Sequence, residues 1–248
     1  MTNFTGSPGT GLRVGVLALQ GGVREHAAAI AATGAAAVPV RRPGDLEGLS
    51  GLVLPGGEST TIGKLLRTYG LADPLEDAIS GGFPVYGSCA GLILLADHLV
   101  DPATDRDGRP QETLGGLDIL VRRNAFGRQR ESFETQLVFD GLDSLPSLPP
   151  GAEPPPVQAV FIRAPEVEKA GDSVRVLARV RDAQPGPVPL PSMNRSADPG
   201  MVSAPEPDSV ARIVAVRSGN LLATSFHPEI TGELRIHELF IQMIRGEA

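Results

Sequence analysis

FPVYGSCAGLILL, residues 83–95, predicts a strand, a sharp turn and a helix in immediate succession. Gly87 and Gly91 lie two residues on either side of Cys89, and glycines at this spacing let a strand and a helix approach closely. The residue between them is then expected to hold a strained backbone that lifts its side chain above the sheet. The start of the helix would favour a thiolate, and the amide of Ala90 would face an oxyanion. The alternative is a buried cysteine that only packs, but its place between these glycines favours a nucleophile.

Segments around this turn alternate between strand and helix, which is typical of a doubly wound α/β fold. The run at residues 14–19 is nearly all apolar, as expected of a strand covered on both faces in a parallel sheet. The expected strands are residues 14–19, 38–40, 52–54 and 85–86. The expected helices are residues 23–33, 61–69, 75–80 and 90–95. We therefore predict a mostly parallel sheet flanked by helices.

The second half of the chain predicts mostly strands, which we expect to extend this sheet and to cover one of its edges. These strands are residues 117–121, 135–138, 157–162, 174–180, 213–216 and 221–224. In residues 231–244, Leu239, Phe240 and Met243 recur at helical spacing, and Thr231 is available as N-cap. This last segment predicts an amphipathic helix that closes the fold.

The length of 248 residues allows one large α/β domain, and the chain has no internal repeat. Residues 1–12 are rich in Gly, Thr, Ser and Pro and predict a disordered leader. Prolines crowd residues 183–209, where they deny backbone donors to any helix or sheet. We expect a single domain over residues 13–246 that contains this proline-rich insertion.

Composition argues against several classes of function. A formal net charge of −7 and a pI near 5.2 oppose nucleic-acid binding, which needs clustered Lys and Arg. The one cysteine cannot form an internal disulfide, and no Cys/His group has the spacing of zinc ligands, so no metal site is expected. With neither a signal peptide nor an apolar run of membrane-spanning length, we expect a cytoplasmic protein with no membrane partner.

A cysteine nucleophile needs an imidazole base, and the imidazole needs a carboxylate to hold its tautomer. Three of the four histidines are better explained as surface or partly packed side chains without a catalytic role: His26, His98 and His237. His227 differs because it follows a strand-like run, at the strand end where active sites of α/β proteins collect. Glu229, two residues on, can turn back to the ring. His-Pro-Glu alone would be an ordinary turn, but with the cysteine turn it predicts the base and its carboxylate.

A third motif, LPGGEST at residues 54–60, follows another predicted strand. Gly56 and Gly57 permit backbone amides to face an oxyanion or a substrate carboxylate, and Glu58 can accept an ammonium group. A turn before a capped helix explains the same letters equally well. The motif is not a phosphate loop, because G-x-x-x-x-G-K-[ST] is absent.

GSCAG, SFHPE and LPGGEST together resemble class I glutamine amidotransferases, whose glutaminase domain uses Cys, His and Glu. Within this class the chain is similar, over about residues 13–244, to the glutaminase subunits of pyridoxal 5'-phosphate synthase. The motifs that carry this resemblance are LALQGGVREH at 17–26, LPGGESTTI at 54–62, GSCAGLILLA at 87–96, RNAFGRQRESFE at 123–134, FIRAP at 161–165 and SFHPE at 225–229. RNAFGRQRESFE and FIRAP are the more specific motifs, since many amidotransferases share the triad.

The resemblance implies a role for each matching residue. Cys89 would be the nucleophile, with His227 and Glu229 completing the triad, and the oxyanion would face Gly57 and Ala90. Six residues are implied to line the glutamine site: Gly56, Gly57, Glu58, Arg123, Ile162 and Arg163. The family resemblance, not the spacing, selects the arginine at 123, because two adjacent arginines are otherwise an exposed, solvated pair.

The reaction implied by the resemblance is hydrolysis of L-glutamine to L-glutamate and ammonia, with the ammonia passed to a synthase subunit that makes pyridoxal 5'-phosphate. This chain would need no cofactor, because pyridoxal 5'-phosphate is the product of the complex. Two alternatives stay open: a glutaminase that serves another synthase, and an inactive scaffold, against which the intact Cys-His-Glu set counts. A cysteine α/β hydrolase would place its acid before the histidine, whereas Glu229 follows His227. The leader and the insertion depart from the compact family pattern without interrupting a motif.

Overall fold

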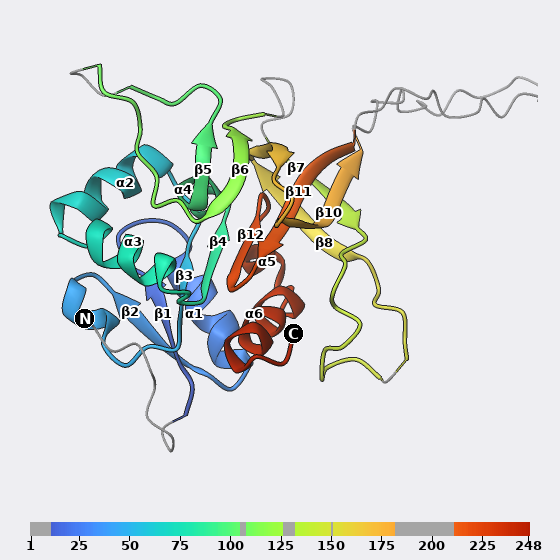
Figure 1. The fold of residues 1–248 in the computed structure, drawn as a ribbon. Helices are drawn as coiled ribbons and strands as arrows, with labels where there is room; N and C mark the ends of the chain where they lie inside the picture. Colours follow the sequence, from blue (N-terminus) through green and yellow to red (C-terminus); the bar gives the residue numbers. More distant parts are fainter. Residues whose placement is uncertain (1–10, 105–107, 126–131, 150, 182–210) are drawn as a thin grey trace, which may run out of the picture.

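A curved sheet runs through the middle of the computed structural model, with helices on both of its faces (Figure 1). The structure describes residues 11–104, 108–125, 132–149, 151–181 and 211–248, so the proline-rich insertion and nearly all of the leader lie outside the described residues. Within the described residues the helices are α1 (Val23–Ala32), α2 (Ser59–Thr68), α3 (Ala72–Ser80), α4 (Ala90–Leu95), α5 (Pro228–Thr231), α6 (Arg235–Arg245) and the 3-10 helix η1 (Pro43–Leu46).

The main sheet has ten strands within the described residues, in the order β2-β1-β3-β4-β12-β11-β9-β6-β5, with β10 paired to β11. They are β1 (Arg13–Leu17), β2 (Ala36–Val40), β3 (Gly51–Leu54), β4 (Val85–Ser88), β5 (Ala96–Leu99), β6 (Leu117–Arg122), β9 (Glu166–Ala170), β10 (Arg175–Arg181), β11 (Ala211–Ser218) and β12 (Leu221–Thr224). Neighbouring strands are parallel from β2 to β12, whereas β11 runs antiparallel to β12, β10 and β9. The predicted mostly parallel, doubly wound sheet is confirmed, and the antiparallel pairs are its additional strands.

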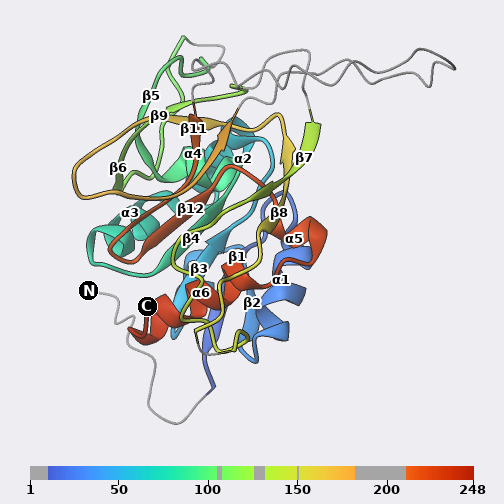
Figure 2. The ribbon, with the colours of Figure 1, turned by 90° about the vertical axis from the view of Figure 1, so that its right-hand side faces the viewer.

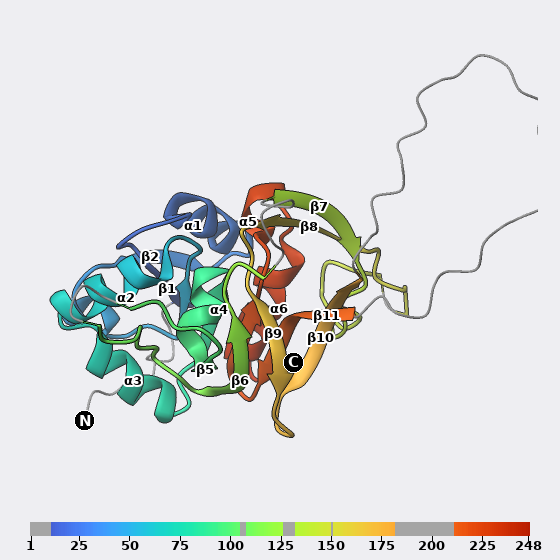
Figure 3. The same ribbon diagram turned by 90° about the horizontal axis from the view of Figure 1, so that it is seen from above.

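Alternating side chains of the central strands divide the core between the two faces of the sheet. On β3, Leu52 and Leu54 pack into the cluster that includes side chains of α2, α3 and α4. Val53 points the other way and packs with side chains of α1 and α6. Figure 3 shows these two groups of helices on opposite sides of the sheet. Because both faces are covered, the central strands are apolar throughout, which is why the sequence predicts them well.

Two strands of the second half do not extend the main sheet, so that part of the prediction was wrong. β7 (Ser132–Leu137) and β8 (Val157–Ile162) form a separate antiparallel pair. Phe133 stacks on Phe161 with ring centroids 4.6 Å apart, and Phe161 also meets Phe226 in the core. The pair therefore covers the core beside α5, as Figure 2 shows.

Two strands of the main sheet, β5 and β9, were missed because their sequences are polar. β5 is Ala-Asp-His-Leu and β9 is Glu-Val-Glu-Lys-Ala, and neither has the apolar run or clear alternation that predicts a strand. The predicted strands that flank the proline-rich insertion do pair, as β10 and β11, with Arg181 opposite Ala211. A short connection is therefore enough to join them.

The last helix begins later than predicted, and Thr231 is not its N-cap. Thr231 ends α5, and its hydroxyl donates to the carbonyl of Pro228 within that short helix at 3.2 Å. Gly232 follows with a φ of 71°, and a glycine in this left-handed conformation ends a helix. Leu234 occupies the N-cap position of α6 instead, without a side-chain cap.

The two glycines around Cys89 stand where backbones meet. A Cβ added at Gly87 would lie 2.5 Å from the carbonyl carbon of Gly91, and one added at Gly91 would lie 2.2 Å from the carbonyl oxygen of Leu54. Both obstacles are backbone atoms of β3 or α4, which cannot rotate away as a side chain can. The spacing therefore lets α4 lie directly against β3 and β4.

Gly91→Ala is expected to lower the free energy of unfolding by about 3 kcal/mol, because the added methyl overlaps backbone. Gly63→Ala is the matched control, since a Cβ there meets nothing closer than 3.7 Å. In the helix interior this second change is expected to be neutral or stabilising by up to about 1 kcal/mol. Urea unfolding of both variants measures the difference, and equal midpoints would show that α4 can move away from β3.

Candidate active site

The carboxyl ends of the parallel strands β1, β3, β4 and β12 share one edge of the sheet, and the predicted site residues follow these ends. Cys89 follows β4 directly and has a φ of 49°, a strained value for a residue with a side chain. Its backbone N–H donates to the carbonyl of Thr224 at 2.7 Å, which ties the turn to β12. The side chain is 6% exposed. The strained turn predicted at residues 87–91 is therefore present.

His227 lies beside Cys89, and Glu229 contacts the ring of His227, in the order that the sequence predicts. The backbone N–H of His227 donates to the carbonyl of Val160 on β8 at 2.9 Å, which holds the turn after β12. Its ring Nδ1 lies 2.8 Å from Oε1 of Glu229. The ring also lies beside Cys89, because a Cβ at Gly56 would be 2.3 Å from Cε1 of His227 and 3.4 Å from Cβ of Cys89. Glu229 is the first-turn acid of α5 and is buried. The three side chains thus form a connected line from thiol to imidazole to carboxylate.

The pKa values of the pair follow from these contacts. Burial alone would lower the pKa of His227, but hydrogen bonds and charge from Cys89 and Glu229 raise it to about 10. Burial would raise the pKa of Glu229, but the hydrogen bond from His227 and the nearby His26 bring it below its usual value. At neutral pH the site therefore favours an imidazolium between a carboxylate and the cysteine sulfur.

The glycine turn after β3 lies beside the imidazole. A Cβ at Gly56 would be 2.3 Å from Cε1 of His227 and 3.4 Å from Cβ of Cys89, so only glycine fits there. Gly57 has a φ of 152°, a value that side chains disfavour. Gln20, in the turn after β1, accepts the N–H of Glu58 at 3.0 Å. Gln20 is a site residue that sequence reasoning missed, although its place after the first parallel strand is a usable signal.

Glu58 caps a helix and also pairs with an arginine. It is the N-cap of α2, where its Oε2 accepts the N–H of Thr61 at 2.8 Å and the hydroxyl of Thr60. Its Oε1 pairs with Arg123 at 3.0 Å. Burial would raise the pKa of Glu58, but the hydrogen bonds from Thr60 and Thr61 lower it below its usual value.

Arg122, the last residue of β6, and Arg123, which follows it, have different partners, a difference that their spacing does not predict. Arg122 pairs with Asp101 at 3.0 Å and with Glu168. Arg123 instead pairs with Glu58 at 3.0 Å and is the more buried of the two. This arrangement brings Arg123 to the glycine turn, whereas Arg122 serves the outer strands.

Ile162 and Arg163 lie at the end of β8, two and three residues after the carbonyl that accepts from His227. Ile162 is 40% exposed, and Arg163 is exposed with a φ of 45°. The strained backbone at Arg163 is the kind that concentrates at functional sites. The structure thus brings β8 to the His227 side of the site.

Two of the three histidines set aside by the sequence, His26 on α1 and His237 on α6, are not surface residues. Both have no exposed surface, and His26 Nδ1 lies 2.9 Å from His237 Nε2. The prediction failed because these helices lie far apart in the chain and pack against each other only in the fold. His98, on β5, is exposed.

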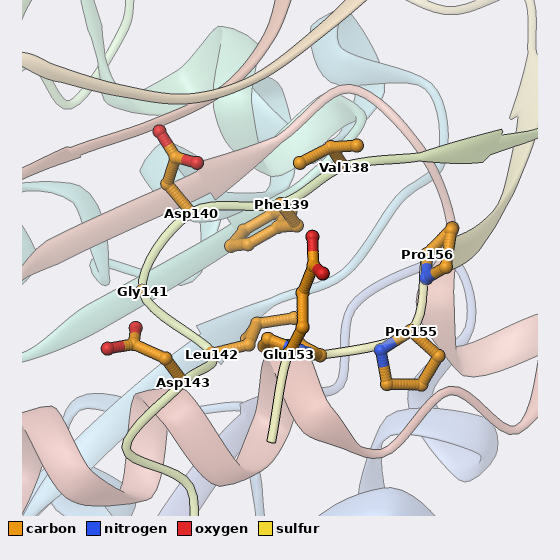
Figure 4. A pocket seen from close by; sticks show the side chains of 10 residues that line it. Val138, Phe139, Asp140, Gly141, Leu142, Asp143, Glu153, Pro155 and Pro156 are labelled. Atoms are coloured by element: carbon orange, nitrogen blue, oxygen red, sulfur yellow. The ribbon is translucent and has the colours of Figure 1, made fainter. Parts of the chain in front are cut away.

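A cavity of about 510 Å³ opens between the segments after β7 and before β8, where Phe139, Leu142 and Pro155 line it (Figure 4). None of Cys89, His227 or Glu229 lines this cavity. In the described part of the chain, no group of three or more His, Cys, Asp and Glu side chains is placed to hold a metal ion. No helix among the same residues is both long and apolar enough to cross a bilayer.

Comparison with known proteins agrees with this architecture. A solved structure titled as a glutamine amidotransferase superposes with a TM-score of 0.71 at 39% identity, covering 94% of this chain and 98% of that one. The fold and the Cys-His-Glu cluster thus define the class of glutamine amidotransferases. The chain belongs to the SNO glutamine amidotransferase family, whose model matches residues 16–246.

Curated relatives narrow the comparison. The pyridoxal 5'-phosphate synthase subunit PdxT of Arthrobacter sp. (strain FB24) is 59% identical over 97% of this chain and 95% of its own. The subunit of the same name from Renibacterium salmoninarum is 54% identical over 95% of this chain and 92% of its own. Both relatives match nearly end to end, so the similarity extends well beyond the shared site motifs.

Proposed function

We propose that this chain is the glutaminase subunit of a pyridoxal 5'-phosphate synthase and hydrolyses L-glutamine to L-glutamate and ammonia. One observation carries the chemistry: the ring of His227 lies beside Cys89 and hydrogen-bonds Glu229 at the carboxyl edge of the parallel sheet. Family membership and the names of the relatives support the substrate and the pathway.

Acylation begins when the sulfur of Cys89 attacks the side-chain amide carbon of glutamine. Negative charge moves to the carbonyl oxygen, where the amides of Gly57 and Ala90 are proposed to stabilise it. His227 gives its proton to the departing nitrogen, so the C–N bond breaks and ammonia leaves. The product is a γ-glutamyl thioester on Cys89.

Deacylation reverses the direction of proton transfer. A water molecule attacks the thioester carbon while His227 takes its proton. The C–S bond then breaks, glutamate leaves, and the thiolate and imidazolium are restored. Glu229 exchanges no proton in either step, because its part is to hold the tautomer and orientation of the ring.

Charged groups at the rim of the site suit the two ends of an amino acid. Arg123 is proposed to bind the α-carboxylate of glutamine, and Glu58 its ammonium group. In the structure these two side chains pair with each other at 3.0 Å. Gly56, Gly57, Ile162 and Arg163 complete the proposed binding site from the turn after β3 and the end of β8.

The partner proposed for this chain is the synthase subunit that incorporates the ammonia into pyridoxal 5'-phosphate. No cofactor is required here, because hydrolysis uses only side chains, backbone amides and water. We place both subunits in the cytoplasm, where a reactive thiol stays reduced.

The test is glutamate release by this chain alone and with a purified pyridoxal 5'-phosphate synthase partner, using glutamine labelled with ¹⁵N in the side-chain amide. Label in the pyridoxal phosphate is expected. Glutamate release with no label transfer would favour a glutaminase of another synthase. Binding to the partner without glutamate release would favour the inactive scaffold.

Glutaminase activity is expected to rise by about 10-fold or more when the partner binds. Ammonia released without an acceptor is lost, and the turn at Gly56 and Gly57 can reorient a peptide unit at low steric cost. Initial rates measured against partner concentration give the size of the effect. Full activity of the isolated chain would contradict this prediction.

The pH dependence of hydrolysis is expected to show a falling limb near pH 10, since His227 has a pKa of about 10 and must carry the proton that it gives to the departing amide nitrogen. Above that pH the imidazolium loses its proton and kcat/KM falls. In Glu229→Gln the limb is expected at lower pH, because the hydrogen bond and charge that favour the imidazolium are gone. Circular dichroism at each pH confirms that the protein stays folded, and an unmoved limb would assign it to another group.

A further inference from the structure

We propose that His26 and His237 are positioning residues that hold the second oxygen of Glu229 and so orient the ring of His227. The proposal rests on the glutaminase mechanism above, which uses neither of these two histidines. They form a buried line that continues the Cys-His-Glu cluster toward the helices on one face of the sheet.

The geometry places this line directly behind the carboxylate. Oε1 of Glu229 is taken by Nδ1 of His227 at 2.8 Å. Oε2 lies 3.5 Å from Nε2 of His26, an ion-pair distance at which Nε2 makes no aligned hydrogen bond, and Nδ1 of His26 lies 2.9 Å from Nε2 of His237. The four side chains thus run from α6 through α1 and α5 to the turn that carries the imidazole.

The direction of the hydrogen bond between His26 and His237 follows from the charge of Glu229. A carboxylate oxygen carries only lone pairs, so we expect the hydrogen of a neutral His26 on Nε2, the nitrogen nearer to that oxygen. Burial lowers the pKa of His26 and brings that of His237 to about 3, so burial favours the neutral form of both rings. Nδ1 of a neutral His26 is then an acceptor, and His237 donates to it. The charge of Glu229 therefore sets the tautomer of His26, and His26 sets the tautomer of His237.

Packing alone does not account for two imidazoles at this place. An apolar side chain fills a core without the desolvation cost of ring nitrogens. Tyr86 packs its edge against both rings, with centroids 6.0 Å from His26 and 5.6 Å from His237, but its hydroxyl is bonded to Thr224 at 2.9 Å. One nitrogen of each ring thus bonds the other ring, and the remaining nitrogen of His26 lies 3.5 Å from the carboxylate of Glu229.

The hydroxyl of Ser88 also hydrogen-bonds Oε2 of Glu229 at 3.5 Å, and it is shared with the carbonyl of Phe226 at 3.3 Å. Without His26 the carboxylate keeps this shared hydrogen bond but loses the adjacent imidazole, so we expect it to orient His227 less firmly. The expected consequence is a slower chemical step with little change in glutamine binding.

The test measures kcat and KM for glutamine hydrolysis by the complex with its partner. His26→Leu is expected to lower kcat by about 10-fold or more, with KM within about twofold, in the range that outer-shell partners show. His26→Gln keeps an N–H near the position of Nε2 and is expected to restore most of the rate. His26→Asn, whose shorter amide falls near Nδ1, is expected to stay slow. Equal rates for His26→Gln and His26→Asn would overturn the proposal. This comparison does not depend on His26→Leu, so it holds even if the leucine variant fails to fold.

A double-mutant cycle separates positioning from general damage to the fold. In the Glu229→Gln background, His26→Leu and His26→Asn are expected to have little further effect, because the group they position is already changed. The full loss in both backgrounds would show that His26 acts elsewhere and would overturn the proposal. The wild-type complex is measured in the same assay, so an inactive wild type would refute the proposed function and not the role of His26 alone.

Discussion

Cys89→Ala is expected to release no glutamate above background, a loss of about 1,000-fold or more, because it removes the atom that forms the thioester. The fold should survive, since the change removes one small buried atom and leaves the hydrogen bond from the backbone of residue 89 to Thr224. Alanine and cysteine both carry a Cβ, so the backbone strain at this position is about equal for the two residues. Rate and thermal unfolding are measured on the same preparation, with and without the partner.

Chemical labelling gives an independent check of the same residue. The chain has 1 cysteine, so a glutamine-like electrophile that reacts with the thiol is expected to add the mass of one reagent molecule per chain. Intact-mass measurement of wild type and of Cys89→Ala then identifies the target without digestion. Wild type is expected to be labelled and then inactive, and free glutamine should slow the labelling. Cys89→Ala should not be labelled. Continued turnover by Cys89→Ala would require a different nucleophile.

His227→Asn is expected to lower kcat by on the order of 10,000-fold. Glu229→Gln is expected to lower kcat by only about 100-fold. The imidazole moves the proton in both steps, whereas the carboxylate only orients it through the 2.8 Å contact to Nδ1. The order of severity is the decisive result, measured as kcat for the complex under saturating glutamine.

His98→Asn is the matched control for these two changes, because this histidine is exposed on β5 and belongs to no part of the proposed machinery. It is expected to keep the wild-type rate. If His227→Asn is no slower than His98→Asn, the base lies elsewhere. If Glu229→Gln is the slower of the pair, the carboxylate takes part in proton transfer and the mechanism above is wrong.

Local signals account for most of what the sequence predicted correctly. The glycines around Cys89 are dictated by backbone contacts within a few residues of the turn and at the neighbouring strand. The central strands are apolar because both their faces are covered. The roles of Cys89, His227 and Glu229 stay predictions, but the structure brings all three together, as strand ends in a parallel sheet must.

Structural features that depend on contacts between distant parts of the chain were missed or misassigned from the sequence. β5 and β9 are polar strands whose order comes from pairing with β6. β7 and β8 have the pattern of sheet strands, yet nothing in that pattern states which sheet they join. Gln20 supports the turn at Glu58, 38 residues away, through one hydrogen bond.

The sequence by itself determined the class of fold, the strained turn at Cys89 and the pairing of His227 with Glu229, because each depends on a short run of residues or on the shared edge of parallel strands. Only the tertiary structure decided that Arg123, and not Arg122, reaches Glu58. It alone joined His26 to a histidine 211 residues away. The physical reason is that a side chain's neighbours across packed helices are chosen by the burial of whole faces, which no local spacing records.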